Sequence, residues 1–183
     1  GLSTITTALI NSGGINEIGS LRNIQLKRSG KTIAKFDLYD LIVRGDTSND
    51  ERLQQGDVLF VPTAQNIVSI DGEVRRPAIY ELTPNESVYD LLALAGGILP
   101  TGDAKSLQLV RNVPGRGLTI FSVDTMSASS KAKLLTNGDF LRIPKASLEF
   151  QNAILVNGAI NVPSLVADND VSLSDIINKQ TLY

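Results

Sequence analysis

The chain has 183 residues, of which 42% are hydrophobic and 20% charged, a balance typical of folded globular proteins and unlike that of disordered ones. Its 19 acidic and 17 basic residues give a net charge of −2, and since the basic residues are scattered, nucleic acid is not an expected partner. Histidine and cysteine are absent, which removes the commonest general base, the usual metal ligands and any disulfide framework, so we expect no metal site and no cofactor.

The first third of the chain is expected to begin with a helix. Ile5, Ala8 and Leu9 recur at helical spacing. Gly13 and Gly14 then favour a helix end, because glycine tolerates the left-handed backbone conformation that often closes a helix. Beyond them we expect a strand at 24–28, a short helix at 36–42 and a strand at 58–61.

A β-hairpin is expected next. Val68 and Ile70 alternate with polar residues, which is typical of a half-buried strand. Residues 79–82 resume an apolar, β-prone run after an interruption at 75–78, where Pro77 favours a turn. The two runs therefore predict the two strands of one hairpin.

The main helix of the repeat is expected at 87–95. Its apolar residues form one stripe at helical spacing, which we expect to lie on a sheet. The N-cap is either Asn85 or Thr83, the latter in a capping box with Glu86. Gly96-Gly97 is expected to end this helix, as Gly13-Gly14 ends the first.

The remaining elements complete a fold class. Strands are expected at 107–111 and 118–123 around a turn at 114–117, and at 140–143 before Pro144. Hairpin, helix, two strands, short helix and last strand make an α+β module with one main helix packed on one mixed sheet. That order is the β-grasp (ubiquitin-like) arrangement.

The chain also repeats itself, which favours tandem modules over one large core. Three pairs of segments match in the same order at offsets of 83, 82 and 86 residues: Ile24–Arg28 with Leu107–Arg111, Leu53–Asp57 with Leu135–Asp139, and Val68–Pro77 with Ile154–Pro163. We therefore predict copy one (1–65), which lacks its leading hairpin, a complete copy two (66–150), and copy three (151–183), which has a hairpin and a helix. Because the repeat is out of phase with the chain ends, we expect a longer parent protein.

The landmarks of copy two resemble a known family. Gly72-Glu73-Val74 and Tyr80, then Ala95-Gly96-Gly97 and the closing Gly138-Asp139, are similar to the SLBB (soluble ligand-binding β-grasp) domain. More narrowly, the tandem copies resemble those of outer-membrane polysaccharide export proteins of the Wza type. One departure is Ala78, where the family usually has glycine.

The resemblance implies a non-catalytic periplasmic segment of an oligomeric conduit that carries capsule or exopolysaccharide to the outer membrane of a Gram-negative cell. Its implied partners are further copies of itself, the polysaccharide, and an inner-membrane synthesis and co-polymerase complex. The alternative is a discrete module that binds a small ligand or a carbohydrate, and an enzyme is a distant third. A conduit segment should have complementary flat sides, whereas a ligand binder should have a closed, mostly apolar pocket.

Four arginines are the candidate contacts for a glycan or a neighbouring subunit, because the guanidinium fork binds anionic groups well. They are Arg75, Arg76, Arg111 and Arg116. The competing interpretation for these residues is an ordinary solvated turn.

No catalytic residue is assigned. Glycoside hydrolysis needs two carboxylates flanking the bond, and Asp71 and Glu73 share a strand face, but alternation points that face to solvent. Asp57 and Asp139 follow glycine at the same place in two copies, which favours a structural turn over ligand binding.

The hairpin of copy three is what copy one lacks. A sheet without its hairpin leaves an edge of unpaired backbone groups. We expect residues 154–166 to complete copy one of another chain, as a reciprocal swap or a head-to-tail chain. The competing interpretation is that copy one borrows the hairpin 68–82 of copy two.

Overall fold

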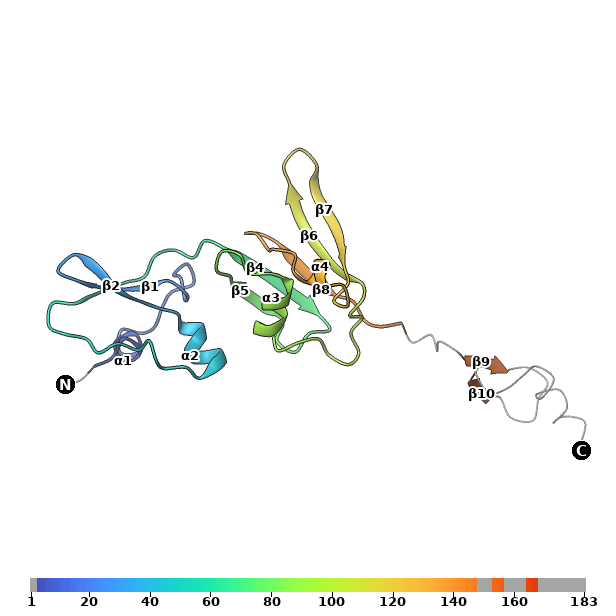
Figure 1. The fold of residues 1–183 in the computed structure, drawn as a ribbon, viewed down its shortest axis with the longest axis horizontal. Helices are drawn as coiled ribbons and strands as arrows, with labels where there is room; N and C mark the ends of the chain where they lie inside the picture. The colour runs from blue at the N-terminus through green and yellow to red at the C-terminus, as the bar shows by residue number, and fades with distance from the viewer. Residues whose placement is uncertain (1–2, 148–152, 157–163, 168–183) are drawn as a thin grey trace, which may run out of the picture. The chain divides into compact units, whose positions relative to one another are not determined.

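The computed structural model describes residues 3–147, 153–156 and 164–167, which fall into two compact units, 1–146 and 147–183. Figure 1 shows the helices and strands of each unit. Within the part of the chain that is described, no helix is long and apolar enough to cross a membrane.

Copy one has two short helices and a three-stranded antiparallel sheet of order β2-β1-β3 (Figure 1). Its elements are α1 (Ile5–Asn11), β1 (Ile24–Arg28), β2 (Lys31–Phe36), α2 (Leu38–Arg44) and β3 (Val58–Phe60). The apolar stripe of α1 packs on this sheet and forms a small core with it. The buried core residues are Ile5, Leu9, Ile24, Leu26 and Phe36.

Copy two has a five-stranded mixed sheet of order β5-β4-β8-β6-β7, in which only the pair of β4 and β8 is parallel. Its elements are β4 (Ile67–Gly72), β5 (Ala78–Glu81), α3 (Val88–Leu94), β6 (Leu107–Val113), β7 (Gly117–Val123), α4 (Ala128–Lys131) and β8 (Phe140–Ile143). Val88, Leu91 and Leu92 of α3 are buried in one cluster with residues of the sheet. The predicted α+β fold and the inward stripe of the main helix are confirmed.

The start of α3 differs from the prediction. Ser87 is the N-cap and forms a capping box with Asp90, whose carboxylate accepts the Ser87 N–H at 2.8 Å. Both predicted caps were wrong. Asn85 has a positive φ of 73°, and Glu86 instead accepts the N–H of Thr83 at 2.7 Å, within the turn before the helix.

The two sheets repeat the same strand pairing. Phe60 of β3 lies opposite Gln25 of β1, and Arg142 of β8 lies opposite Gln108 of β6, so the sequence offsets hold in space. The hairpin of β4 and β5 belongs to the sheet of copy two. The interpretation that copy one borrows the hairpin 68–82 is therefore wrong.

The described residues of the second unit form a hairpin of β9 (Ala153–Val156) and β10 (Ser164–Ala167). Ala153 pairs with Ala167, as Ile67 pairs with Glu81 in the hairpin of copy two. The hairpin expected in copy three is thus present, in the register of the earlier one. The helix expected after it, at 172–177, lies outside the described residues.

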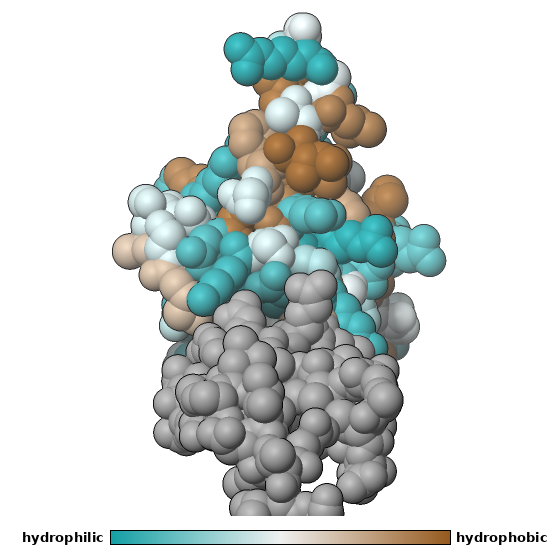
Figure 2. Space-filling view, turned by 90° about the vertical axis from the view of Figure 1, so that its right-hand side faces the viewer, coloured by the Kyte–Doolittle hydropathy of each residue, from teal (hydrophilic) through white to brown (hydrophobic). Residues whose placement is uncertain are grey.

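β6 and β7 form a long hairpin that projects from the sheet of copy two (Figure 1). Leu118 and Ile120 on β7 are 77% and 65% exposed. Figure 2 shows apolar side chains gathered along this projection beneath a polar tip. Exposed apolar surface of this kind is typical of contact with another molecule.

Candidate functional site

A buried carboxylate joins copy one to copy two. Glu81, at the end of β5, accepts hydrogen bonds from Ser20 Oγ at 2.6 Å and from the N–H groups of Leu21 and Arg22 at 2.7 and 3.2 Å. Its own N–H donates to the Tyr39 hydroxyl at 3.1 Å. Because a buried carboxylate is stable only when its oxygens are hydrogen-bonded, these donors fix the turn before β1 against β5.

Arg22 forms the second part of this junction. Its side chain is 5% exposed, and its guanidinium binds Asp37 of copy one at 2.9 Å and Glu86 of copy two at 2.6 Å. The guanidinium carbon also lies 4.9 Å from the centre of the Tyr39 ring, which meets the Tyr80 ring edge-on. Buried pairs of this kind are sensitive to the loss of either partner, so they hold the two copies in a defined relationship.

The same arginine–aspartate pair occurs in both copies. Arg28 binds Asp57 through two contacts of 2.8 Å, and Arg111 binds Asp139 through contacts of 2.8 and 2.5 Å. Asp57 also accepts the N–H of Gln54 at 2.8 Å, which closes the turn before β3. The hydrogen bonds from Arg28 lower the pKa of Asp57 to about 2. Both aspartates therefore have the structural turn role that their recurrence indicated.

Arg111 is thus committed to an internal pair, whereas the other three candidate arginines are exposed. Arg75 and Arg76 lie in the turn between β4 and β5, and Arg76 donates to the carbonyl of Leu94 at 2.8 Å. Arg116 lies in the turn between β6 and β7. Since β5 and β7 are the two opposite edges of the sheet, the four arginines do not form one cluster. Their contact with a glycan or a subunit stays a prediction.

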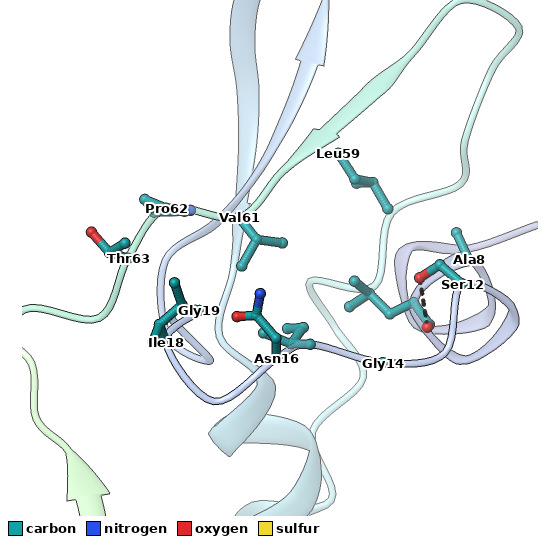
Figure 3. Close-up of a pocket in the computed structure, with 12 residues that line it drawn as sticks. Ala8, Ser12, Gly14, Asn16, Ile18, Gly19, Leu59, Val61, Pro62 and Thr63 are labelled. Carbon is teal, nitrogen blue, oxygen red and sulfur yellow. Dashed lines mark hydrogen bonds between the residues drawn. The ribbon is translucent and has the colours of Figure 1, made fainter.

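A groove lies between α1 and β3 of copy one (Figure 3). Its volume is about 450 Å³. Leu9, Ser12 and Gly14 line it from α1 and the loop that follows, and Leu59 and Val61 line it from β3 and its continuation. Its walls are mainly apolar side chains and backbone, and one wall is the edge strand of a sheet.

In copy two the hairpin of β4 and β5 occupies the equivalent position. The N–H of Glu73 donates to the carbonyl of Ile143 at 3.0 Å, and the N–H of Arg75 donates to the carbonyl of Gly97 at 3.1 Å. Gly72 makes this close approach with a φ of 92°, and a Cβ there would lie 2.1 Å from the Ile143 carbonyl oxygen. Only glycine fits this position without displacing the backbone.

The acceptors of that hairpin have counterparts in the groove of copy one. Val61 corresponds to Ile143, and Gly14 corresponds to Gly97, by the offsets of the repeat. Among the described residues, none donates a hydrogen bond to the carbonyl of Val61 or of Gly14. The groove therefore has the form and the open backbone acceptors of a hairpin-binding site.

The carboxylates considered for hydrolysis are not arranged as a facing pair. Asp71 is exposed on β4, as predicted. Glu73 lies beyond the end of β4, is half-buried and accepts a hydrogen bond from the Thr101 hydroxyl, so the expectation that both share one solvent-facing strand face was wrong. Residues 3–147 and the described hairpin contain no group of three or more His, Cys, Asp or Glu placed to hold a metal ion.

Sequence reasoning did not find the junction of Glu81 and Arg22. In β5 the apolar Ile79 is 69% exposed while Glu81 is 9% exposed, the reverse of what hydropathy favours. The cause is the set of donors supplied by residues 20–22, about which the local sequence of β5 carries no signal. The groove did have a signal, because the repeat places Val61 and Gly14 at the positions of Ile143 and Gly97, whose carbonyl groups accept hydrogen bonds from the hairpin in copy two.

Residues 67–122 match the family model of the SLBB domain. The match extends from β4 through α3 and β6 into β7, which are the hairpin, main helix and projecting hairpin of copy two. The SLBB resemblance is confirmed for this part of the chain. SLBB domains are a ligand-binding, non-catalytic family.

Proposed function

We propose that the chain is a non-catalytic periplasmic segment of a polysaccharide export protein, in which tandem SLBB copies form part of an oligomeric conduit to the outer membrane of a Gram-negative cell. The observation that carries the proposal is the SLBB match in copy two, preceded by a copy with the same strand pairing. The proposed partners are further copies of the chain, capsule or exopolysaccharide, and an inner-membrane synthesis and co-polymerase complex.

The junction between the copies supports a structural role. Modules of a conduit must keep a constant spacing while a polymer passes. Glu81 and Arg22 give this contact several charge-assisted hydrogen bonds, which are directional and specify one arrangement. Independent ligand-binding modules can be joined by a flexible linker alone, without a buried network of this kind between them.

The surface supports weak, many-point contact with a glycan. Aromatic residues are 5% of the chain and tryptophan is absent, which leaves little surface on which sugar rings can stack. Exposed arginines in the two turns, Arg75 and Arg116, offer forked donors to anionic groups instead. Such contacts suit the passage of a polymer better than its capture.

One observation favours the alternative of a small-ligand module. A hollow of about 620 Å³ lies at the junction and is lined mostly by apolar groups. Tyr39 and Glu81 are among its few polar lining residues. Apolar walls with a few polar groups are typical of small-molecule sites. Ile67 and Ile79 also line this hollow, so Ile79→Trp should fill it and abolish any small-ligand binding while leaving polysaccharide export unchanged.

The transport proposal is tested in the organism that carries the gene. We expect deletion of the gene to leave polysaccharide synthesis intact but to remove the polymer from the cell surface, with recovery on complementation. The polymer is measured on intact cells and in lysates of the same cultures. Surface polymer that is unchanged by the deletion would contradict the proposal.

The arginine contacts are tested with the purified chain and an anionic exopolysaccharide. We expect Arg75→Ala with Arg116→Ala to weaken binding several-fold, because two exposed forked donors are removed. The charge-matched control is Arg52→Ala with Arg142→Ala, two exposed arginines outside the hairpin turns. Equal weakening in both double variants would assign the binding to net charge alone.

A further inference from the structure

β7 is an open edge of the sheet in copy two. Among the described strands its one neighbour is β6, with which all seven of its residues pair in unbroken antiparallel register. The opposite edge, β5, is in contact with copy one, where the Tyr39 hydroxyl accepts the N–H of Glu81 at 3.1 Å. An open edge presents a row of backbone N–H and C=O groups that can pair with another strand.

The sequence of β7 lacks the features that usually protect such an edge. Edge strands of natural proteins commonly carry charged residues, proline or a β-bulge. β7 reads Gly-Leu-Thr-Ile-Phe-Ser-Val, with no charge and no proline, and Leu118 and Ile120 on it are mostly exposed. A regular, apolar strand with one unpaired side is the usual template for strand addition.

The corresponding strand of copy one is protected. β2 pairs with β1 as β7 pairs with β6, and it is likewise an edge of its sheet. It carries Lys31 and Lys35, and its register with β1 shifts between Leu26 and Lys27. Lysines and a bulge discourage pairing with a further strand. Because the two copies share this strand pairing, the unprotected edge is a particular property of copy two.

The residues that flank β7 make the strand complementary to itself. In an antiparallel pair of two β7 strands, all seven residues overlap when Ile120 lies opposite its counterpart. Arg116 then lies opposite Asp124 of the second chain, at both ends of the contact, and opposite charges in facing positions are stabilising. Among the described residues neither Arg116 nor Asp124 forms an ion pair. A parallel pair in register would instead place Arg116 beside Arg116.

We propose that β7 pairs antiparallel with β7 of a second copy of this chain, with Ile120 opposite Ile120, so that the two sheets become one continuous sheet. The contact has a two-fold axis, because both chains offer the same surface. Backbone hydrogen bonds hold the strands together, and Arg116 and Asp124 set their direction and register. The proposal goes beyond polysaccharide transport and does not need it, so failure of either proposal leaves the other untouched.

The oligomeric state of the purified full chain tests the edge. By light scattering we expect species of at least twice its 19.6 kDa mass as concentration rises. Ile120→Lys should abolish the pairing of the strands, because it places two like charges opposite each other at the two-fold axis. The matched control is Ile79→Lys, an equally exposed isoleucine on the other edge strand, which should leave the association unchanged. A chain that is monomeric at every concentration, or equal effects of the two lysines, would overturn the proposal.

Charge reversal tests the direction of the strands. Arg116→Asp should weaken the dimer several-fold, because each end of the contact then brings two aspartates together. Asp124→Arg should weaken it for the same reason, with two arginines. The chain that carries both changes should regain affinity, since each pair is restored in reversed order. A dissociation constant of the double variant no lower than those of the single variants would overturn the antiparallel assignment.

Cysteine cross-linking tests the register, because the chain has no cysteine of its own. We expect the Ile120→Cys variant to form disulfide-linked dimers on oxidation, since each cysteine lies opposite its counterpart within disulfide distance. Leu118→Cys is the matched control on the same face of the strand. Its counterpart would lie four residues further along the strand, about 13 Å away, which is too far for a disulfide.

Mixing variants completes the register test. Leu118→Cys should form linked dimers with Ser122→Cys, which it faces in this register. The absence of linked dimers from Ile120→Cys, or equal linking of Leu118→Cys to itself, would overturn the proposal. Links of Ile120→Cys to Ile79→Cys in preference to itself would assign the edge to β5 of the neighbouring chain, and would overturn it as well.

Discussion

Glu81 and Ser20 are 61 residues apart in the sequence, yet the Ser20 hydroxyl donates to the Glu81 carboxylate at 2.6 Å. The contact joins the last residue of β5 in copy two to the turn before β1 in copy one. Both side chains are buried, and Ser20 Oγ also accepts the N–H groups of Arg22 and Asn23 in its own turn. The pair connects the two copies, which makes it the most direct place to test whether they act together.

Glu81→Ala should lower the free energy of unfolding by about 3 kcal/mol, because it leaves the buried donors of residues 20–22 without an acceptor. Urea denaturation followed by circular dichroism measures the loss. The control is Glu17→Ala, an exposed carboxylate of copy one, which should change stability by less than about 0.5 kcal/mol. A loss for Glu81→Ala that is as small as the loss expected for the control would mean that the junction does not stabilise the fold.

Acid should weaken the turn before β3. The pKa of Asp57 is lowered from 3.8 to about 2 by its hydrogen bonds from Arg28, so the folded state holds this carboxylate ionised more strongly than the unfolded state does. Its stabilising contribution is therefore complete above about pH 4 and is lost as the pH falls towards about 2. Melting temperatures across this range should fall less steeply for Asp57→Asn than for the parent chain. Asp71→Asn, an exposed residue of β4, should keep the parent's slope.

Gly72→Ala should destabilise copy two severely. The new Cβ would lie 2.1 Å from the carbonyl oxygen of Ile143 and would sit on a backbone with a φ of 92°. We expect a loss of about 3 kcal/mol or more in urea denaturation. Gly138→Ala is the matched control, since its φ is 84° but nothing lies within 4 Å of the added atom, and we expect about 1 kcal/mol. Equal losses would show that backbone strain, and not the close approach of the strands, makes Gly72 necessary.

We expect this chain not to cleave polysaccharides. Asp71 is exposed, and Glu73 is tied to Thr101, so the two carboxylates do not flank a common space for a glycosidic bond. We expect no change in the molar mass of neutral or anionic exopolysaccharides after long incubation, measured by size-exclusion chromatography. Shortening of a polymer that disappears in Asp71→Asn or Glu73→Gln would contradict a non-catalytic role.

Elements with a strong local pattern could be predicted from the sequence. The stripe of Val88, Leu91 and Leu92 correctly predicted which face of the main helix is buried. The strand predicted at 140–143 agrees with β8. These signals depend on residues within one or two turns of each other, where periodicity and burial are linked directly. The repeat then extended the prediction from one copy to the next.

Features that depend on distant partners could not be predicted in the same way. Asn85 and Thr83 are both good capping residues by type, but Ser87 is the cap because it stands one position before the first helical residue and has Asp90 three positions on. The buried position of Glu81 could not be predicted, because its sequence neighbours carry no signal of the contact with Ser20. Arg111 was open to an external ligand until its pairing with Asp139 was seen.

The parallel pairing of β4 with β8 has a consequence for how copy two is completed during synthesis. Ser69 lies opposite Phe140, which comes 71 residues later in the chain, and in the sheet β4 has only β5 and β8 as neighbours. The leading hairpin is therefore made long before the strand that joins it to the rest of the sheet. Copy two can close its sheet only when nearly all of its residues are available.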